Sequence, residues 1–387
     1  MKYKVSHPTG LIECDINLPS SKSISNRLLI IQSLCKDKFR ISNLSKSDDT
    51  YVLQKALKSR NRTIDIGFAG TSFRFLTSYF ASSKDRDIIL TGSSRIKKRP
   101  IKELVRALNS MGAKVSYCGE KDHAPLRIEG RDLLGGEIVI PANISSQFIS
   151  SLLLIAPTLS NGLKIHLSGK IVSRSYIDMT LKLMRDFGID SSWDDHTIKI
   201  SHQDYIARDY AVEADWSSAS VWYQIAALSK ECHIKLKGLR EDSIQADNFL
   251  IKLFKDLSVE SKFHKNDLIL KKTKLLDLKR EIDIINTPDL YISLVCTLYA
   301  LGISKNIKGI DTLIDKESNR IESIQQGIIK LKNNKDILTY HDHRIAMGFA
   351  PLCLNFGELS IDDPKVVSKS YPNFWKDFKK AGFIIDL

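Results

Sequence analysis

The chain has 387 residues, of which 43% are hydrophobic and 27% are charged. This length and composition exclude a disordered or fibrous chain and predict a globular protein with two domains. The formal net charge is +13, from 58 Lys and Arg against 45 Asp and Glu. By itself this excess suits an anionic substrate, a nucleic acid or an acidic surface equally. No basic arm or recognisable nucleic-acid module is present, so we attribute most of the charge to solvated helix faces and expect no nucleic-acid partner.

The cysteines and the N-terminal segment give information on the cellular compartment of the protein. The six cysteines are widely spaced, at positions 14, 35, 118, 232, 296 and 353, and they predict reduced thiols and no metal site. Residues 1–16 alternate like a strand and contain no apolar signal core. No apolar run approaches the length needed to span a bilayer. We therefore expect a cytoplasmic protein with no membrane partner, and we expect it to be a monomer.

Taken in chain order, the sequence repeats one kind of helix pair. Six openings rich in hydroxyl, Gly or Asp residues lead into apolar helices, at 21–34, 69–81, 145–157, 215–228, 288–300 and 342–354. Six amphipathic segments follow them, at 48–59, 99–112, 173–188, 243–257, 316–331 and 371–382. Short alternating runs predict strands at 86–92, 136–142, 163–169, 196–201, 232–238 and 267–272. The pattern predicts an α/β protein built from six loose copies of one unit.

The domain boundary carries no Pro, Gly or Ser linker, so we expect the chain to cross between the domains on ordinary strands. Two crossings, near residues 19–21 and 212–215, would divide the six helix pairs evenly. One predicted domain therefore comprises residues 1–20 and 215–387, and the other comprises residues 21–214. The extreme N-terminus then belongs with the C-terminal half.

The opening at residues 18–31 is the first candidate site. Lys22 stands at a helix start, where free backbone N–H groups attract anions, and Ser23 and Arg27 share one face because they are four residues apart. This predicts a cradle for phosphate or carboxylate, although an ordinary capped helix with solvated cations explains the same residues. A second anion site is predicted at Gly70 and Thr71, where glycine lets a ligand approach the backbone closely.

The remaining openings add polar groups of other kinds. Their candidates are Ser145, Ser146 and Gln147, then Ser173 and Tyr176, then Asp289, then Lys316, Glu317 and Arg320, then Asp342, His343 and Arg344, and finally Lys369. Each has an ordinary explanation as well, because serines cap helices, an acid in a first turn is common, and Lys, Glu and Arg within one turn form exposed ion pairs.

These residues, taken together, carry a resemblance to a known family. SKSxxxR, AGTxxRFL, RPI, SSQ, DxSSA, PD, KESxR, DHRxAM and SKSYPxFW occur in this order over essentially the whole chain. The chain thus resembles the 5-enolpyruvylshikimate-3-phosphate synthase family of enolpyruvyl transferases. The resemblance implies two domains, each of three βαβαββ units with buried helices, in the inside-out barrel-like fold of that superfamily. It also implies that the domains close on their ligands.

The resemblance implies transfer of the enolpyruvyl group of phosphoenolpyruvate to the 5-hydroxyl of shikimate 3-phosphate, with no cofactor and no metal. It implies Asp289 as proton acceptor and Glu317 as the group that exchanges a proton with the methylene, assisted by Lys22. The implied shikimate 3-phosphate contacts are Lys22, Ser23, Arg27, Ser145, Ser146, Gln147, Ser173, Asp289 and Lys316. The implied phosphoenolpyruvate contacts are Lys22, Gly70, Arg99, Gln147, Arg320, Arg344 and Lys369, and further candidates are Thr71, Tyr176, Thr312 and His343.

Three positions depart from the family pattern. Phe68 replaces the usual Asn before AlaGlyThr, which removes an amide from the enolpyruvate pocket and predicts weaker binding of phosphoenolpyruvate and of glyphosate. Asn319 stands where KESDR is common, so Glu317 and Arg320 are expected to be held differently. Thr312 stands where many members place Asn, and its hydroxyl is still able to donate to a phosphate.

Two alternatives remain at this stage. The UDP-N-acetylglucosamine enolpyruvyl transferase has a signature cysteine just before an ArgPro pair, whereas residues 93–100 here read SSRIKKRP. A catalytically idle member that binds phosphorylated metabolites or nucleic acid through its cations would have no need for both an acid and a base. The presence of Asp289, Glu317 and Lys22 argues against it.

Overall fold

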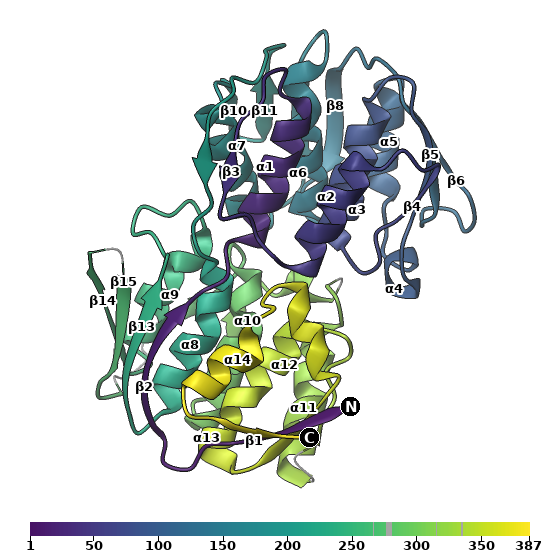
Figure 1. The fold of residues 1–387 in the computed structure, drawn as a ribbon. Helices are drawn as coiled ribbons and strands as arrows, with labels where there is room; N and C mark the ends of the chain where they lie inside the picture. Colours follow the sequence, from purple (N-terminus) through teal and green to yellow (C-terminus); the bar gives the residue numbers. More distant parts are fainter. Residues whose placement is uncertain (266, 276–280, 315, 334–335) are drawn as a thin grey trace. The chain divides into compact units, whose positions relative to one another are not determined.

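The computed structural model describes residues 1–265, 267–275, 281–314, 316–333 and 336–387. It divides into two compact units (Figure 1), which we call the N/C unit, residues 1–21 and 213–387, and the central unit, residues 22–212. The predicted crossings lie after residue 20 and before residue 215. At the first, the Ser21 amide donates to the Glu213 carbonyl at 2.8 Å, and at the second, the Asp215 amide donates to the Pro19 carbonyl at 2.8 Å.

The central unit contains two complete βαβαββ units. In one, β4 and β5 are parallel and the antiparallel strands β7 and β6 complete the sheet, while in the other β8 and β9 are parallel and β11 and β10 complete it. The helices are α1 (Lys22–Leu34), α2 (Asp48–Lys58), α3 (Gly70–Ala81), α4 (Ser94–Lys97), α5 (Lys102–Ser110), α6 (Ser146–Ile155) and α7 (Arg174–Asp186). The strands are β3 (Ile41–Ser42), β4 (Thr63–Asp65), β5 (Asp87–Thr91), β6 (Lys114–Tyr117), β7 (Leu126–Glu129), β8 (Gly136–Pro141), β9 (Leu163–Ser168), β10 (Ser192–Asp194), β11 (Thr197–Ile200) and β12 (Tyr210–Ala211).

The N/C unit repeats this arrangement with the N-terminal strands inserted. Strand β2 pairs in parallel with β13, and β1 lies antiparallel between β19 and β20. The helices are α8 (Trp216–Leu228), α9 (Leu250–Lys255), α10 (Tyr291–Ala300), α11 (Arg320–Asn333), α12 (His343–Phe349), α13 (Cys353–Phe356) and α14 (Phe374–Lys380), with short 3-10 turns η2 (Ala246–Phe249), η3 (Pro288–Leu290), η4 (Asp311–Leu313) and η6 (Pro364–Lys369). The strands are β1 (Lys2–Ser6), β2 (Leu11–Asn17), β13 (Glu231–Lys237), β14 (Val259–His264), β15 (Asp267–Lys272), β16 (Ile282–Asp283), β17 (Ile307–Lys308), β18 (Asp336–Ile337), β19 (Leu359–Asp362) and β20 (Ile384–Asp386).

The six apolar openings predicted from the sequence become the buried helices of the two units. Helices α1, α3 and α6 pack against one another in the central unit, and α8, α10 and α12 do so in the N/C unit. Every residue of α8 is buried, because small and apolar side chains occupy all of its faces. The predicted α/β fold class is therefore confirmed, and the described strands form separate sheets without a closed barrel.

Some predicted elements differ in their limits. Helix α11 begins at Arg320, so Lys316 and Glu317 lie in the loop before it, whereas the pattern had predicted a helix from residue 316. The segment 243–257 forms only η2 and the short α9. The two remaining sheets, β3 with β12 and β16 with β17, are parallel pairs of two-residue strands within the described residues.

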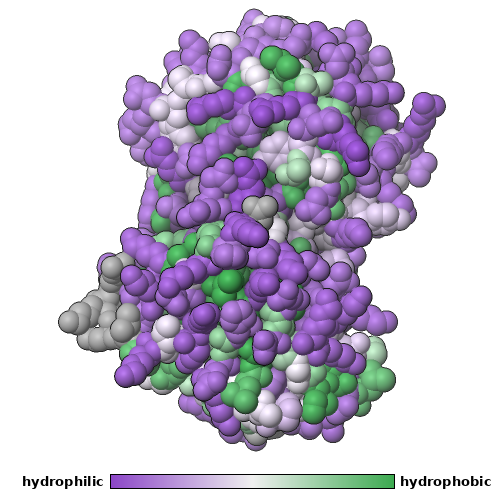
Figure 2. Space-filling model, turned by 60° about the vertical axis from the view of Figure 1, so that its left-hand side comes forward, coloured by the Kyte–Doolittle hydropathy of each residue, from purple (hydrophilic) through white to green (hydrophobic). Residues whose placement is uncertain are grey.

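The surface and the cysteines complete the description. The face in Figure 2 is covered largely by hydrophilic side chains, with small apolar areas between them. All six cysteines are free thiols, and Cys14, Cys296 and Cys353 are buried. In the described part of the chain, no helix is long and apolar enough to cross a membrane.

Candidate active site

A buried cluster of carboxylates and guanidinium groups lies in the N/C unit. Asp289 is the second residue of η3, which begins with a proline, and Arg320 is the first residue of α11. Asp342 is the N-cap of α12, where its side chain accepts from the Arg344 amide at 3.0 Å. We call Asp289, Glu317, Arg320, Asp342 and Arg344 the acid–arginine cluster.

Arg320 is the centre of this cluster. Its Nη1 donates to Asp289 Oδ1 at 2.9 Å, its Nη2 to Glu317 Oε2 at 3.1 Å and its Nε to Asp342 Oδ2 at 3.0 Å. The Arg320 side chain is 1% exposed, so these three bonds to carboxylates are made inside the protein. Arg320 therefore orients both predicted proton-transfer groups, Asp289 and Glu317. Asp289 also accepts a hydrogen bond from Arg344 Nη2 at 2.8 Å.

The charges in the cluster shift two pKa values in opposite directions. Burial alone would raise the pKa of Asp289, but the positive charges of Arg344, Lys316 and Arg320 hold it well below its usual range. Burial alone would lower the pKa of Arg320, but the carboxylates of Asp342, Asp289 and Glu317 raise it above its usual value. Asp289 is therefore an ionised carboxylate, in the form that accepts a proton.

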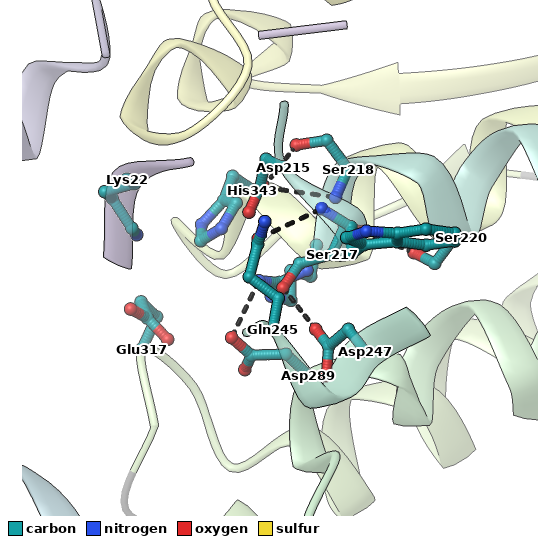
Figure 3. A network of polar contacts seen from close by, with 12 residues as sticks. Lys22, Asp215, Ser217, Ser218, Ser220, Gln245, Asp247, Asp289, Glu317 and His343 are labelled. Atoms are coloured by element: carbon teal, nitrogen blue, oxygen red, sulfur yellow. Dashed lines mark hydrogen bonds and ion pairs between the residues drawn. The ribbon is translucent and has the colours of Figure 1, made fainter. Parts of the chain in front are cut away.

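The other predicted residues of the N/C unit lie around the cluster. Lys369 Nζ is 3.2 Å from Glu317 Oε1, and its side chain is 9% exposed. His343 is buried beside Asp342, with Nδ1 3.8 Å from Oδ1. Lys316 is close enough for its charge to act on Asp289, and Thr312 is the middle residue of η4. Figure 3 shows Glu317, Asp289 and His343 in one close-up of this region.

Lys22 begins helix α1 in the central unit. Its Nζ is 3.2 Å from Asp49 Oδ2, and the two side chains are 15% and 5% exposed. Asp49 comes from the first turn of α2, and nothing in the sequence had marked it. The ammonium group is thus held at the helix start by an acid from the neighbouring helix.

Arg27 is bonded inside the central unit. Its guanidinium donates to Thr180 Oγ1 at 2.7 Å, to the Tyr176 carbonyl at 3.1 Å and to the Ser23 carbonyl at 2.8 Å. Burial lowers the pKa of Arg27 to about 10, and the charge of Tyr176 acts in the opposite direction. Arg27 also donates to Ser150 Oγ at 3.3 Å, so it ties α1 to both α6 and α7.

The predicted anion site at Gly70 is bordered by two arginines. Arg74 Nη1 donates to the Gly70 carbonyl at 3.0 Å, and a Cβ atom added at Gly70 would collide with the guanidinium of Arg99. Gln147 Nε2 donates to Thr71 Oγ1 at 3.3 Å, which links the starts of α3 and α6. The buried Gln147 Oε1 has no hydrogen-bond partner among the described residues, which leaves one acceptor for a ligand.

The predicted serines lie at helix starts. Ser145 is the N-cap of α6 and accepts from the Gln147 amide at 3.3 Å, and Ser146 is the first residue of that helix. Ser173 precedes α7 in a left-handed conformation with φ of 54° and is 3% exposed. A non-glycine residue held in this region is uncommon and costs about 1–3 kcal/mol.

Each of the two units contains its own group of polar and charged residues. The N/C unit holds three carboxylates beside Arg320, Arg344 and Lys369, and the central unit holds cations and hydroxyls at helix starts. Within the described residues, no group of three or more His, Cys, Asp or Glu side chains is placed to hold a metal ion. The sequence had suggested Asp342 only as a neighbour of His343, although an Asp at a helix start is a recognisable cap signal.

Comparison with known proteins identifies the family. The family model described as EPSP synthase (3-phosphoshikimate 1-carboxyvinyltransferase) matches residues 7–59, 52–338 and 326–378. A 3-phosphoshikimate 1-carboxyvinyltransferase of Bacteroides fragilis is 44% identical over 405 residues, which cover 99% of this chain and 98% of the relative. The protein of the same name from Buchnera aphidicola is 35% identical, with 96% of this chain and 95% of the relative covered.

A solved structure supports the fold independently. The EPSP synthase of Acinetobacter baumannii superimposes with a TM-score of 0.79 and covers 100% of both chains at 19% sequence identity. At that identity the likeness concerns the fold alone, and it agrees with the α/β architecture described above. With the match over the full length of the chain, it confirms the predicted resemblance. The chain belongs to the EPSP synthase (3-phosphoshikimate 1-carboxyvinyltransferase) family.

Proposed function

We propose that this protein transfers the enolpyruvyl group of phosphoenolpyruvate to the 5-hydroxyl of shikimate 3-phosphate and releases phosphate, a step of chorismate and aromatic amino-acid biosynthesis. The observation that carries the proposal is the convergence of Asp289 and Glu317 on one buried guanidinium. An addition followed by an elimination needs a base for the hydroxyl and an acid for the methylene. A site that only binds anions needs neither.

The reaction proceeds in two balanced steps. Asp289 takes the proton of the 5-hydroxyl while the hydroxyl oxygen attacks the enol carbon, and Glu317 in its protonated form gives a proton to the methylene, which becomes a methyl group. The tetrahedral adduct then returns a proton from that methyl group to Glu317 while the C–O bond to phosphate breaks, and the proton held by Asp289 passes to the released phosphate or to solvent. Lys22 assists by stabilising negative charge on the departing phosphate.

The Arg344 contact explains how a weakly basic Asp289 serves as the base. Arg344 Nη2 lies 2.8 Å from Asp289 Oδ2, and its charge helps to lower the pKa of Asp289. We assign Arg344 to phosphoenolpyruvate, together with Lys22, Gly70, Arg99, Gln147, Arg320 and Lys369. Once the substrate anion attracts the Arg344 guanidinium, the pKa of Asp289 rises and its carboxylate becomes a better proton acceptor.

The other substrate, shikimate 3-phosphate, is bound in our proposal by Lys22, Ser23, Arg27, Ser145, Ser146, Gln147, Ser173, Asp289 and Lys316. Thr71, Tyr176, Thr312 and His343 are proposed as further contacts. The buried Gln147 Oε1 supports this assignment, because a hydroxyl of the substrate would give it a donor. The free, widely spaced cysteines support a reducing, cytoplasmic location for the reaction.

Phosphate release tests the proposed reaction. The purified protein is mixed with phosphoenolpyruvate and either shikimate 3-phosphate, UDP-N-acetylglucosamine or no acceptor. We expect release only with shikimate 3-phosphate, and a loss of roughly 10²-fold or more in Lys22→Met. Release with the nucleotide sugar instead would assign the related transferase activity, and binding of shikimate 3-phosphate without any release would identify an idle binding protein.

Phe68 offers a test of substrate affinity. Its side chain is 50% exposed just before α3, where the family usually places an amide. We expect Phe68→Asn to lower the KM for phosphoenolpyruvate and the inhibition constant of glyphosate roughly tenfold, because a hydrogen bond to a charged ligand is gained. Leu134→Asn, which changes an apolar side chain 62% exposed in the same unit, is the matched control. Equal constants for Phe68→Asn and the unmodified protein would refute the role of this position.

A further inference from the structure

Asp247 is a buried carboxyl group to which the reaction above gives no task. It lies in η2, is 5% exposed, and accepts a hydrogen bond through Oδ2 from the Ser217 hydroxyl of α8. Within the described part of the chain, this is the only hydrogen bond to its carboxyl group, and no cation forms an ion pair with it. A buried carboxylate with a single neutral donor is poorly stabilised in its charged form.

Two neighbouring acids, Asp215 and Asp289, are held quite differently. Asp215 caps α8 and accepts from the Ser218 amide at 3.1 Å and the Ser218 hydroxyl at 2.6 Å. Asp289 accepts from the guanidinium groups of Arg320 and Arg344. These donors stabilise the charged carboxylate, whereas among the described residues Asp247 accepts only from the Ser217 hydroxyl.

Asp247 lies within electrostatic reach of the predicted base. Figure 3 shows Asp247 and Asp289 near the start of α8. The pKa of Asp247 is raised to about 7. Burial is the largest cause and the negative charges of Asp289 and Asp215 act in the same direction, while the Ser217 hydrogen bond and the charge of Arg344 oppose them. The groups that face Asp247 are thus Asp215 and Ser217 of the α8 start, Asp289 of η3 and Arg344 of α12.

A purely structural role is the alternative. The Ser217–Asp247 hydrogen bond joins η2 to the first turn of α8. Stabilising this contact between η2 and α8 would be a sufficient reason for both residues. A tie of that kind predicts lower stability on mutation and an activity loss that is the same at every pH. A charge that acts on the base predicts a loss that changes with pH.

We propose that Asp247 is a positioning residue for the reaction, and that its carboxylate, held by Ser217 near Asp289 (Figure 3), tunes the basicity of Asp289. This inference rests on the proposed function, because it assumes that Asp289 accepts the substrate proton. Charge interactions are reciprocal. An ionised Asp289 favours the protonated form of Asp247, and an ionised Asp247 favours the protonated form of Asp289 to the same extent. An ionised Asp247 also competes with Asp289 for the Arg344 charge. Both effects strengthen the base once Asp247 has lost its proton.

The test compares kcat of the unmodified enzyme and Asp247→Asn across pH, with saturating substrates. The amide is uncharged at every pH, so it mimics the protonated acid. The ratio of unmodified to variant kcat is expected to rise roughly three- to tenfold between about pH 6 and about pH 8.5. The reason is that the side chain at position 247 ionises in this range only in the unmodified enzyme. A ratio that stays constant over this range would overturn the proposal and leave the structural tie.

Ser217→Ala is the second variant. Removing the hydroxyl takes away a donor that favours the charged form, so the rise in kcat is expected to move to higher pH rather than disappear. If Asp247→Asn does not fold, the shift of the pH dependence of kcat in Ser217→Ala still tests the proposal. A pH dependence of kcat that is the same in Ser217→Ala and in the unmodified enzyme would overturn it. Turnover by the unmodified enzyme is measured first, so failure of the proposed function appears there and is distinct from failure of the Asp247 role.

Discussion

Replacing Asp289 with Asn is expected to lower kcat roughly 10²- to 10⁴-fold while changing the dissociation constant of shikimate 3-phosphate much less. The amide keeps the shape of the side chain, and its oxygen still accepts a hydrogen bond from Arg320 or Arg344, which now lie 2.9 Å and 2.8 Å from the carboxylate oxygens. It cannot take a proton from the 5-hydroxyl. The loss should therefore fall on the chemical step, and stopped-assay turnover together with calorimetric titration of shikimate 3-phosphate measures both quantities.

Asp283→Asn is the matched control for this substitution. Asp283 is an exposed residue six positions earlier in the same unit, and its Oδ1 accepts only from the Ile285 amide at 2.9 Å among the described residues. The same chemical change there should leave turnover within about twofold. Equal losses of turnover and of binding in Asp289→Asn would contradict the role of Asp289 as the base and assign it to binding.

Replacing Arg320 with Gln is expected to lower the free energy of unfolding by about 3–5 kcal/mol and to abolish turnover. Arg320 is 1% exposed and bonds to the carboxylates of Asp289, Glu317 and Asp342. Without the guanidinium, the three carboxylates, which are at most one-fifth exposed, lose the positive charge that they share and repel one another. Urea denaturation followed by intrinsic fluorescence measures the loss of stability.

Arg240→Gln is the control for Arg320. Arg240 also forms a two-pronged contact with a carboxylate, at 3.0 and 2.9 Å from Asp242, but the two side chains are 53% and 73% exposed. An exposed pair of this kind contributes about 0–1 kcal/mol, so the midpoint should hardly move. A stability loss for Arg320→Gln as small as that for Arg240→Gln would show that the cluster is not held together by its central guanidinium.

Local sequence patterns were sufficient to predict most of the fold. The apolar helices, such as α6 and α8, were predictable because an N-cap residue, Ser145 or Asp215, precedes a run of small and apolar residues. The alternation over residues 1–16 predicted one strand, and the segment forms two, β1 and β2, with alternate residues of β2 buried. The two-residue strands β3 and β12 were not predicted, because a pair of residues carries no period.

The site was predictable where a motif holds the residues together in sequence, and not where the fold brings them together. Glu317 and Arg320 lie three residues apart and bond directly. The ion pair of Lys22 with Asp49 joins residues 27 apart, and the Ser217–Asp247 bond joins residues 30 apart. Nothing in the local sequence marks such partners, because the packing of α1 on α2 and of η2 on α8 creates the contacts.

The departures from the family pattern now have a structural setting. Asn319 donates through Nδ2 to Glu322 Oε2 at 3.3 Å, and within the described part of the chain its side chain does not bond to Glu317 or Arg320. Arg320 nevertheless bonds to Glu317 at 3.1 Å, and Asp342 fixes its other edge at 3.0 Å. The cap residue of α12 therefore supplies orientation that the sequence had led us to expect from position 319.

The most direct test of the account is to identify the product. Phosphoenolpyruvate and shikimate 3-phosphate are incubated with a catalytic amount of the protein, and proton NMR follows the vinyl signals while free phosphate is measured. We expect the vinyl protons of phosphoenolpyruvate to be replaced by those of an enol ether on the shikimate ring, in an amount equal to the phosphate released. Phosphate with pyruvate and no enol ether would mean hydrolysis rather than transfer, and would contradict the central claim.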